Sequence, residues 1–221
     1  MATVLHTRRR GFFQLLALYH LFGLTLVGVM LGLAGTFLFG FYAQKVPSSV
    51  AFERLRVNAS TSTRIVAADG TLLARISGER REWAPLHTIP VLQRKAFIAI
   101  EDARFKEHGA LDTMGLVRAM ITNIRHGAIR QGGSTITQQV AEFYMGGERT
   151  FDRKIREVIL ALRLERKLSK DQILELYLNL IFLCRRASGV KAAARNYFDK
   201  PREELTLAEM ALLAGLAQAP S

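Results

Sequence analysis

The 221-residue chain has very little cysteine and comparatively little negative charge. Cys184 is the single cysteine, which excludes a disulfide within the chain and a CxxC motif for a metal or redox site. Lysine and arginine total 31 against 19 acidic residues, a formal net charge of +12 that is spread along the chain. Such a charge favours anionic partners such as lipid headgroups, pyrophosphates or nucleic acid, although a solvated basic surface without a ligand explains it equally well.

Charged residues are absent from positions 11–44, where leucine, phenylalanine, valine and glycine dominate. This run exceeds the ~20 residues that cross a bilayer, so we predict a transmembrane helix over 12–43. Three arginines (8–10) precede it, whereas only Lys45 closely follows it. By the positive-inside rule, residues 1–11 are expected in the cytoplasm and the chain after Lys45 on the outer side of the membrane.

The chain after the membrane helix is expected to form a linker, 44–62, and then one domain over 63–221. Asp69-Gly70 between two short runs rich in β-branched and apolar residues predicts a hairpin over 64–76. Helical periodicity dominates the rest of the domain. The predicted helices cover 93–106, 115–124, 135–144, 152–167, 170–183, 190–197 and 207–217. The fold after the membrane helix is therefore expected to be mainly α, with a small β-hairpin at its entrance.

A carboxylate, an aromatic ring and an imidazole recur at helical spacing in the first candidate motif. Glu101, Phe105 and His108 fall at i, i+4 and i+7, so a helix would place them on one face, with Asp102 adjoining. Partial burial would raise the pKa of the Glu101 carboxyl group and suit it to proton transfer. For an acidic pair alone, an exposed acidic helix face with a core phenylalanine is the more common explanation.

A glycine pair opens the second motif, residues 132–139 (GGSTITQQ). Thr135 and Gln138 have the spacing of a capping box, which predicts a helix N-terminus. The free N–H groups and hydroxyls at such a terminus suit a phosphate or pyrophosphate. An ordinary capped helix is the simpler explanation of the spacing, whereas the run of hydroxyl and amide side chains is unusual for a helix start with only a structural role.

The third motif places two cations around one carboxylate. Arg153 and Lys154 lie four and three residues before Glu157, so a single helical turn holds all three side chains. The functional interpretation is a cationic clamp on a diphosphate, with Glu157 held ionised by its neighbours. The alternative is a surface ion-pair ladder that contributes only a few tenths of a kcal/mol.

The fourth motif, residues 173–179 (ILELYLN), is mostly typical of a packing helix. Glu175 and Asn179 share one face of that helix at i, i+4. Each of the four motifs is only suggestive by itself. Their order and spacing along the chain are what support a functional prediction.

Together these residues closely resemble the peptidoglycan glycosyltransferase domain of class A penicillin-binding proteins, glycosyltransferase family 51. The five motifs of that family are matched at 101–108, 132–139, 153–157, 173–179 and 211–221. The resemblance implies a lysozyme-like, mainly α fold at the outer face of the cytoplasmic membrane. It also implies that the substrate is lipid II, the undecaprenyl-diphosphate-linked disaccharide peptide.

By the same resemblance, Glu101 is the general base that deprotonates the acceptor 4-hydroxyl, and Glu157 orients the donor diphosphate and its cations. A divalent cation, Mg²⁺ or Mn²⁺, is expected with the diphosphate, without a metal site formed directly by a protein motif. The implied partners are lipid II, the growing glycan strand, the membrane and other cell-wall synthesis proteins, and not nucleic acid. The residues implied to bind substrate are Asp102, Phe105, His108, Gly133, Ser134, Thr135, Gln138, Gln139, Arg153, Lys154, Glu175 and Asn179.

The chain departs from the family pattern at several positions. Glu142 stands where a Lys or Arg that contacts the diphosphate is usual, and Ser188 and Asp199 replace a usual Tyr and Gly. We also expect the domain to be truncated at its C-terminal end, with no transpeptidase domain. These departures leave open a catalytically impaired, membrane-anchored paralogue that binds lipid II or a cell-wall partner without turnover. A muramidase-like hydrolase is a third alternative, less favoured because a hydrolase does not need a diphosphate clamp.

Overall fold

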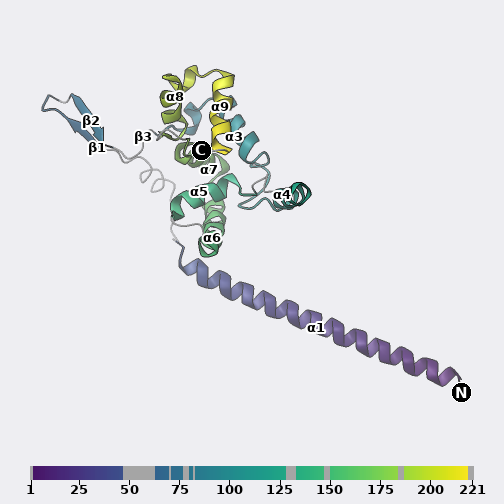
Figure 1. Ribbon diagram of the computed structural model, residues 1–221. Coiled ribbons are helices and arrows are strands. Elements are labelled where there is room, and N and C mark those ends of the chain that lie inside the picture. The colour runs from purple at the N-terminus through teal and green to yellow at the C-terminus, as the bar shows by residue number, and fades with distance from the viewer. Residues whose placement is uncertain are drawn as a thin grey trace. The chain divides into compact units, whose positions relative to one another are not determined.

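The structure is a computed structural model that divides into two compact units, Met1–Lys45 and Val46–Ser221 (Figure 1). Most of the predicted linker, together with Gly70, Gly132 and Cys184, lies outside the described residues. The residues that the structure describes are 2–46, 63–69, 71–76, 80–81, 83–127, 133–146, 150–183 and 187–218.

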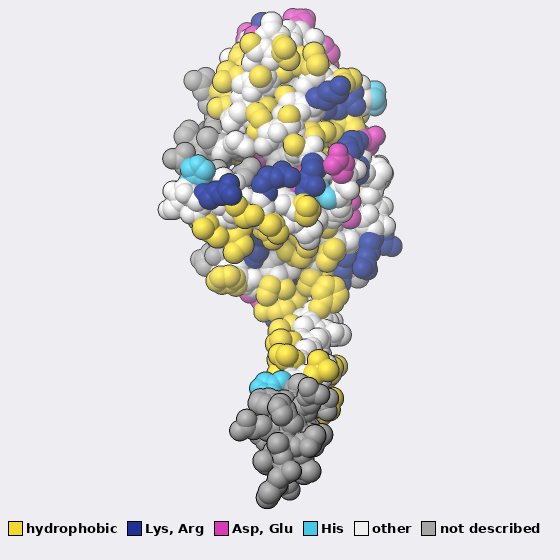
Figure 2. Space-filling model, turned by 90° about the vertical axis from the view of Figure 1, so that its right-hand side faces the viewer, with side chains coloured by type: hydrophobic (Ala, Val, Ile, Leu, Met, Phe, Trp, Pro, Cys, Tyr) yellow, Lys and Arg dark blue, Asp and Glu magenta, His cyan; other side chains and the backbone are white. Residues whose placement is uncertain are grey.

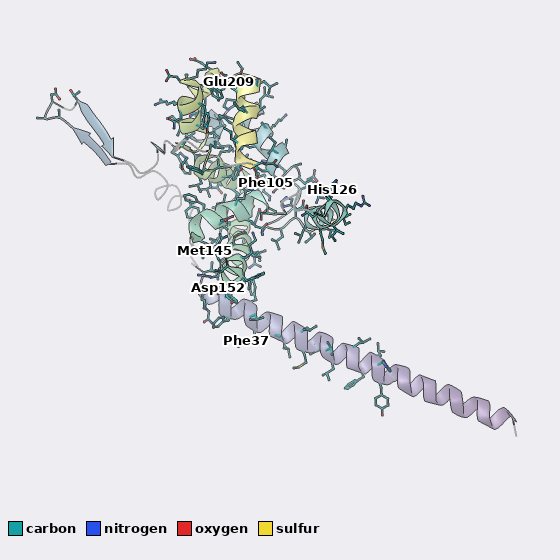
Figure 3. All side chains as sticks on the ribbon, viewed as in Figure 1. Phe37, Phe105, His126, Met145, Asp152 and Glu209 are labelled. Atoms are coloured by element: carbon teal, nitrogen blue, oxygen red, sulfur yellow. The ribbon has the colours of Figure 1, made fainter. Side chains whose placement is uncertain are left out.

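The first unit is one long helix, α1 (Ala2–Gln44), which includes the predicted membrane crossing. Its Leu18–Gln44 part is long and apolar enough to cross a membrane, by length and composition, and Figure 3 shows Phe37 standing out from its surface. Thr25 and Thr36 donate their hydroxyl hydrogens to helix carbonyl oxygens three and four residues earlier, at 2.8 and 2.9 Å. The backbone thus satisfies both hydroxyls, which lets an otherwise apolar helix carry threonine.

The second unit is mainly helical, as predicted, and includes the expected hairpin. Strands β1 (Thr63–Val66) and β2 (Leu72–Ile76) pair antiparallel. In the turn between them, the backbone N–H of Thr71 donates to the Asp69 carboxylate at 2.9 Å, which lowers the pKa of Asp69. The remaining elements are β3 (Arg80–Arg81), η1 (Leu86–Thr88), α3 (Val91–Glu101), α4 (Thr113–His126), α5 (Ile136–Met145), α6 (Phe151–Lys167), α7 (Lys170–Leu180), β4 (Ala187–Ser188), α8 (Val190–Phe198), η2 (Arg202–Glu204) and α9 (Leu207–Gln218).

Helix α7 forms the core of the second unit. It is buried on almost every side, and Ile173, Leu176 and Leu178 are fully enclosed. Helix α5 packs against both α6 and α7, and α3 packs against α9 (Figure 1). The short strands β3 and β4 pair in parallel, a contact that joins distant parts of the chain and that the sequence did not predict. The apolar residues of α7 pack into the core, while its polar Glu175 and Asn179 are bonded to the segment before η1.

The helix starts confirm the capping chemistry expected from the sequence. Thr135 and Gln138 form the predicted capping box at the start of α5. Ser169 and Gln172 form a second capping box at the start of α7. Thr150 caps α6, a role that the sequence analysis did not assign. These caps satisfy amide groups that would otherwise lack partners in the first turns, and they fix where α5 and α6 begin.

Helix α3 is shorter than predicted, because the helix expected over 93–106 stops at Glu101. Asp102 leaves the helical conformation, with φ −158° and ψ 73°. The expectation that the first motif shares one helix face is therefore wrong, since Phe105 and His108 lie in the turns that follow. Glu101 is instead placed at a helix end, where the chain changes direction.

Helix α4 exposes an apolar face to its surroundings. Figure 2 looks onto the side of the unit that carries α4 and shows apolar side chains gathered beside a row of Lys and Arg side chains. A contiguous apolar patch beside cations is typical of a surface that meets a membrane or a partner protein. The exposed apolar residues of α4 are Met114, Leu116, Val117, Met120, Ile121 and Ile124.

Gly189 connects the end of the α7 region to α8 in a conformation that favours glycine. Its φ is +83°, and a Cβ atom there would lie 2.8 Å from the backbone oxygen of Asn179. We expect Gly189→Ala to lower the free energy of unfolding by about 2–4 kcal/mol, through left-handed backbone strain and overpacking. Gly109→Ala is the matched control, because a Cβ there meets nothing within 4 Å. Equal losses in the thermal stability of the two variants would contradict the structure.

Candidate active site

Glu101 ends α3 beside the middle of α5. The side-chain amide of Gln139 donates to Oε2 of Glu101 at 2.6 Å, while Oε1 is buried with no hydrogen-bond partner among the described residues. Burial raises the pKa of the Glu101 carboxyl group, the Gln139 bond lowers it, and the charge of Asp102 raises it, with a net rise. A carboxylate with a raised pKa and one uncommitted oxygen has the properties of a general base.

Asp102 joins the end of α3 to the start of α5. Its Oδ1 lies 2.7 Å from Nε2 of His108, and its Oδ2 accepts the backbone N–H of Ile136 at 3.1 Å. The Thr135 hydroxyl adds a second tie by donating to the backbone oxygen of Ala110 at 2.7 Å. Asp102 is only 8% exposed, so its carboxylate is used inside the protein. The substrate-binding roles predicted for Asp102 and His108 stay predictions, whereas their structural contacts hold the first and second motifs together.

The predicted binding residues Phe105, Glu175 and Asn179 also make structural contacts. Phe105 is fully buried inside the helical body (Figure 3). The Glu175 carboxylate accepts from the Trp83 indole N–H at 3.0 Å and from the backbone N–H of Leu86 at 2.8 Å. The Asn179 side chain accepts the backbone N–H of Ala84 at 2.7 Å and donates to the backbone oxygen of Ala84 at 2.9 Å. Their contact with a substrate remains a prediction, and the structure shows them anchoring the chain before η1.

A group of Asp102, His108 and Asp112 has ligand atoms within 4.8 Å of one another. Each carboxylate is already committed to protein donors. Asp112 caps α4 by accepting the N–H of Gly115 at 2.8 Å, and it also pairs with Arg104. Among the described residues, this group therefore fits a hydrogen-bonded structural network better than a cation site.

The third motif forms a charged cluster on the first turns of α6. Lys154 Nζ contacts Oε1 of Glu157 at 2.5 Å and the hydroxyl of Ser134 at 3.2 Å. Arg153 Nη1 lies 3.8 Å from Oε2 of Glu157 and 3.1 Å from Oε1 of Glu142. Glu157 is fully buried. The alternative of an exposed ion-pair ladder is thus wrong. The Glu157 carboxylate is buried and holds two cations, Arg153 and Lys154, beside α5.

A cleft of about 470 Å³ is lined by residues of α5, of the C-terminal part of α7, of the segment that follows α7, and by Ser188 of β4. Three of its polar wall residues are the partners of the charged groups just described. Gln139 bonds Glu101, Ser134 bonds Lys154, and Glu142 pairs with Arg153. The other polar and aromatic walls are Phe143, Tyr177, Phe182 and Ser188. The cleft wall therefore includes the partner of a candidate base and the partners of a cationic cluster.

Most residues of the cleft wall were not among the predicted site residues, and Tyr177 and Ser188 are two of them. Tyr177 is 2% exposed, and its hydroxyl has no hydrogen-bond partner among the described residues. Burial raises the pKa of Tyr177, and the nearby charge of Glu101 raises it further. The only feature of the sequence that could have indicated Tyr177 as a wall residue is its position between Glu175 and Asn179 in the fourth motif. Ser188 is buried in β4, and no residue pattern in the sequence placed it against α5.

Comparison with known proteins shows that residues 69–221 match the protein-family model described as Transglycosylase. The chain belongs to the transglycosylase family. This confirms the family predicted from the five motifs. The chain is 49% identical over 158 residues to penicillin-binding protein 1A of Neisseria cinerea, and 47% identical over 195 residues to penicillin-binding protein 1A of Escherichia coli K12.

The transglycosylase match covers only part of these relatives. The alignments include 71% and 87% of this chain but 20% and 23% of the Neisseria and Escherichia proteins, so the chain spans about a fifth of their length. A crystal structure of penicillin-binding protein 1A from Haemophilus influenzae is also similar, at 30% identity over 73% of this chain and 14% of that chain, with a TM-score of 0.37.

We expect Gln139→Ala to move the acidic limb of the activity profile to higher pH. A general base works when deprotonated, so activity falls as the pH drops through the raised pKa of Glu101. Loss of the Gln139 bond removes the contact that lowers this pKa. The measurement is kcat/KM against pH for polymerisation of lipid II, the substrate that the family resemblance implies. Gln218→Ala is the matched control, because Gln218 donates to the backbone oxygen of Ile100 and not to the carboxylate. If the acidic limb of the pH profile has the same midpoint in Gln139→Ala as in Gln218→Ala, the assignment of Glu101 as the general base is contradicted.

We expect Tyr177→Phe to leave the free energy of unfolding unchanged or to raise it by up to about 1 kcal/mol, because the removed hydroxyl is buried without a protein partner. Tyr197→Phe is the matched control. The Tyr197 hydroxyl donates to the backbone oxygen of Leu183 at 2.8 Å, so its loss should destabilise by about 1 kcal/mol. Denaturant unfolding of both variants checks this, and an equal loss in both would show that the Tyr177 hydroxyl has a stabilising partner.

Proposed function

We propose that the chain is a peptidoglycan glycosyltransferase that polymerises lipid II into glycan strands and releases undecaprenyl diphosphate. The observation that carries this proposal is one cleft whose wall includes the hydrogen-bond partner of Glu101 and the partners of Arg153 and Lys154. A glycosyl transfer from a diphosphate donor needs a base for the attacking hydroxyl and positive charge at the leaving group. Glu101 and the cluster of Arg153, Lys154 and Glu157 would supply these two requirements.

In this mechanism the Glu101 carboxylate takes the proton of the acceptor 4-hydroxyl. The acceptor oxygen forms a bond to the anomeric carbon of the donor, with inversion, as the bond from that carbon to the diphosphate oxygen breaks. The diphosphate leaves with the electron pair of that bond. Lys154 and Arg153 stabilise the developing negative charge, and the buried Glu157 holds both cations in position.

A divalent cation, Mg²⁺ or Mn²⁺, is expected to accompany the substrate diphosphate. The described residues fit such an ion, because Oε2 of Glu157 is buried, has no hydrogen-bond donor and lies at the cationic cluster. This oxygen and the diphosphate itself would hold the cation, which supplies further positive charge for the leaving group. The protein residues alone account for proton removal and for holding the donor.

The proposed location is the cytoplasmic membrane, with a single crossing by α1. The Leu18–Gln44 segment has the required length and composition, and arginines 8–10 precede it. This orientation puts the N-terminus in the cytoplasm and the cleft outside. The exposed apolar face of α4 suits contact with the same lipid phase that carries the substrate. Other cell-wall synthesis proteins are the expected protein partners.

One observation favours the second candidate, a paralogue that binds lipid II or a cell-wall partner without turnover. Glu142 occupies the cleft wall and pairs with Arg153 at 3.1 Å, where the family resemblance leads us to expect a cation. A carboxylate at this place weakens the attraction for a diphosphate.

Polymerisation of labelled lipid II by the purified chain tests the proposal. The wild type should form glycan strands, and Glu101→Gln should reduce their rate by roughly 10²–10⁴-fold, the usual contribution of a general base. Glu107→Gln is the matched control, because Glu107 is exposed in the turn after α3 and should leave the rate unchanged. A folded wild type without product would favour the non-catalytic paralogue. Equal rates for Glu101→Gln and wild type would remove the role assigned to Glu101.

A further inference from the structure

The wall of the cleft contains a carboxylate that the proposed reaction does not use. Glu142 lies one helical turn after Gln139 on α5, and both residues line the cleft. It is the only charged residue among the described residues of the wall. Oε1 of Glu142 lies 3.1 Å from Nη1 of Arg153. Glu142 therefore pairs with one of the two cations that the proposed function assigns to the donor diphosphate.

The charges of the cluster are balanced among the described residues. Arg153 and Lys154 contribute two positive charges, and Glu142 and Glu157 contribute two negative charges. Lys154 is held by Glu157 at 2.5 Å. A diphosphate that enters the cleft therefore meets a site with little net positive charge, next to an acidic wall residue. Like charges at close range lower affinity unless one of them moves away or is neutralised.

The two partners in the Glu142 pair differ in their freedom to move. The Glu142 side chain is 40% exposed, whereas the Arg153 side chain is 10% exposed and also adjoins Glu157. Water reaches the Glu142 carboxylate, so it can replace Arg153 as the partner of Glu142 when a diphosphate binds Arg153. Arg153 would stay in place when the pair opens, and Glu142 would turn toward solvent.

We propose that Glu142 competes with the diphosphate for Arg153, so that this site binds a diphosphate strongly only together with a divalent cation. This inference rests on the proposed function, in which the donor is a diphosphate. The cation offsets the repulsion between Glu142 and the diphosphate, and it thereby replaces the positive charge that Arg153 loses to the pair. Glu142 thus determines which form of the diphosphate the site accepts, the free anion or its metal complex.

The opposing explanation is that Glu142 only neutralises a buried arginine. In that case its removal would leave Arg153 without its nearest partner and would not improve diphosphate binding. A matched pair elsewhere in the chain separates the two explanations. Glu203 pairs at 2.8 Å with Arg202, which is 7% exposed, and neither residue belongs to the cleft wall.

Calorimetric titration of the full chain in detergent with farnesyl diphosphate tests the inference, with EDTA in one series and Mg²⁺ in the other. The wild type should bind much more tightly with Mg²⁺ than with EDTA. In EDTA, Glu142→Gln should bind on the order of fivefold more tightly than the wild type, the effect of one part-exposed charge. Glu142→Lys should bind more tightly still, and Glu203→Gln should match the wild type. Thermal unfolding of each variant shows that it is folded.

Unchanged or weaker binding by both Glu142 variants in EDTA would overturn the inference, and so would equally tight binding by the wild type in both series. Absence of binding by every protein in both series would overturn it as well, because no diphosphate site would exist. The assay measures binding without turnover. A chain that shows the expected binding but forms no glycan strands would therefore refute the proposed function and leave the role of Glu142 intact.

Discussion

The carboxylate of Asp102 is shared between the loop that carries His108 and the first amide of α5. Both oxygens are used at the place where α3 stops, since Asp102 leaves the helical conformation directly after Glu101. The same two bonds hold the start of α5 against that helix end. Glu101 consequently faces Gln139, and its remaining oxygen is buried without a protein donor. A structural aspartate thus creates the environment that prepares its neighbour for proton transfer.

The cationic cluster of Arg153, Lys154 and Glu157 also depends on where α5 begins. Ser134 precedes the capping box and contacts Lys154, which in turn binds the buried Glu157. The partners of the Glu101 carboxylate and of the two cations therefore line the same cleft. In the proposed function, Glu142 acts on donor binding through its pair with Arg153, whereas the proton acceptor Glu101 is bonded by Gln139. Donor recognition and proton removal would then depend on different residues.

Local sequence signals predicted much of this molecule. The apolar run of α1, the hairpin turn at Asp69 and the capping box at Thr135 all rest on neighbouring residues, and each is present. The end of α3 was missed because a long-range bond from Asp102 to α5 overrides local helical periodicity.

Other features escaped prediction because they form only in the folded chain. The parallel pair of β3 and β4 joins residues about 100 positions apart. The ion pair of Glu142 and Arg153 and the buried hydroxyl of Tyr177 likewise depend on how α5, α6 and α7 pack. The spacing of the motifs identified the family and most of the charged groups, but it contained no information on which of them neutralise one another.

In the proposed mechanism, Lys154 serves donor binding and Glu101 serves proton removal. The most direct test measures farnesyl diphosphate binding in Mg²⁺ alongside glycan-strand formation, for Glu101→Gln and Lys154→Met. We expect Glu101→Gln to bind the diphosphate like the wild type but to form almost no strands, whereas Lys154→Met should lose both binding and product. Loss of diphosphate binding in Glu101→Gln equal to that in Lys154→Met would contradict this mechanism.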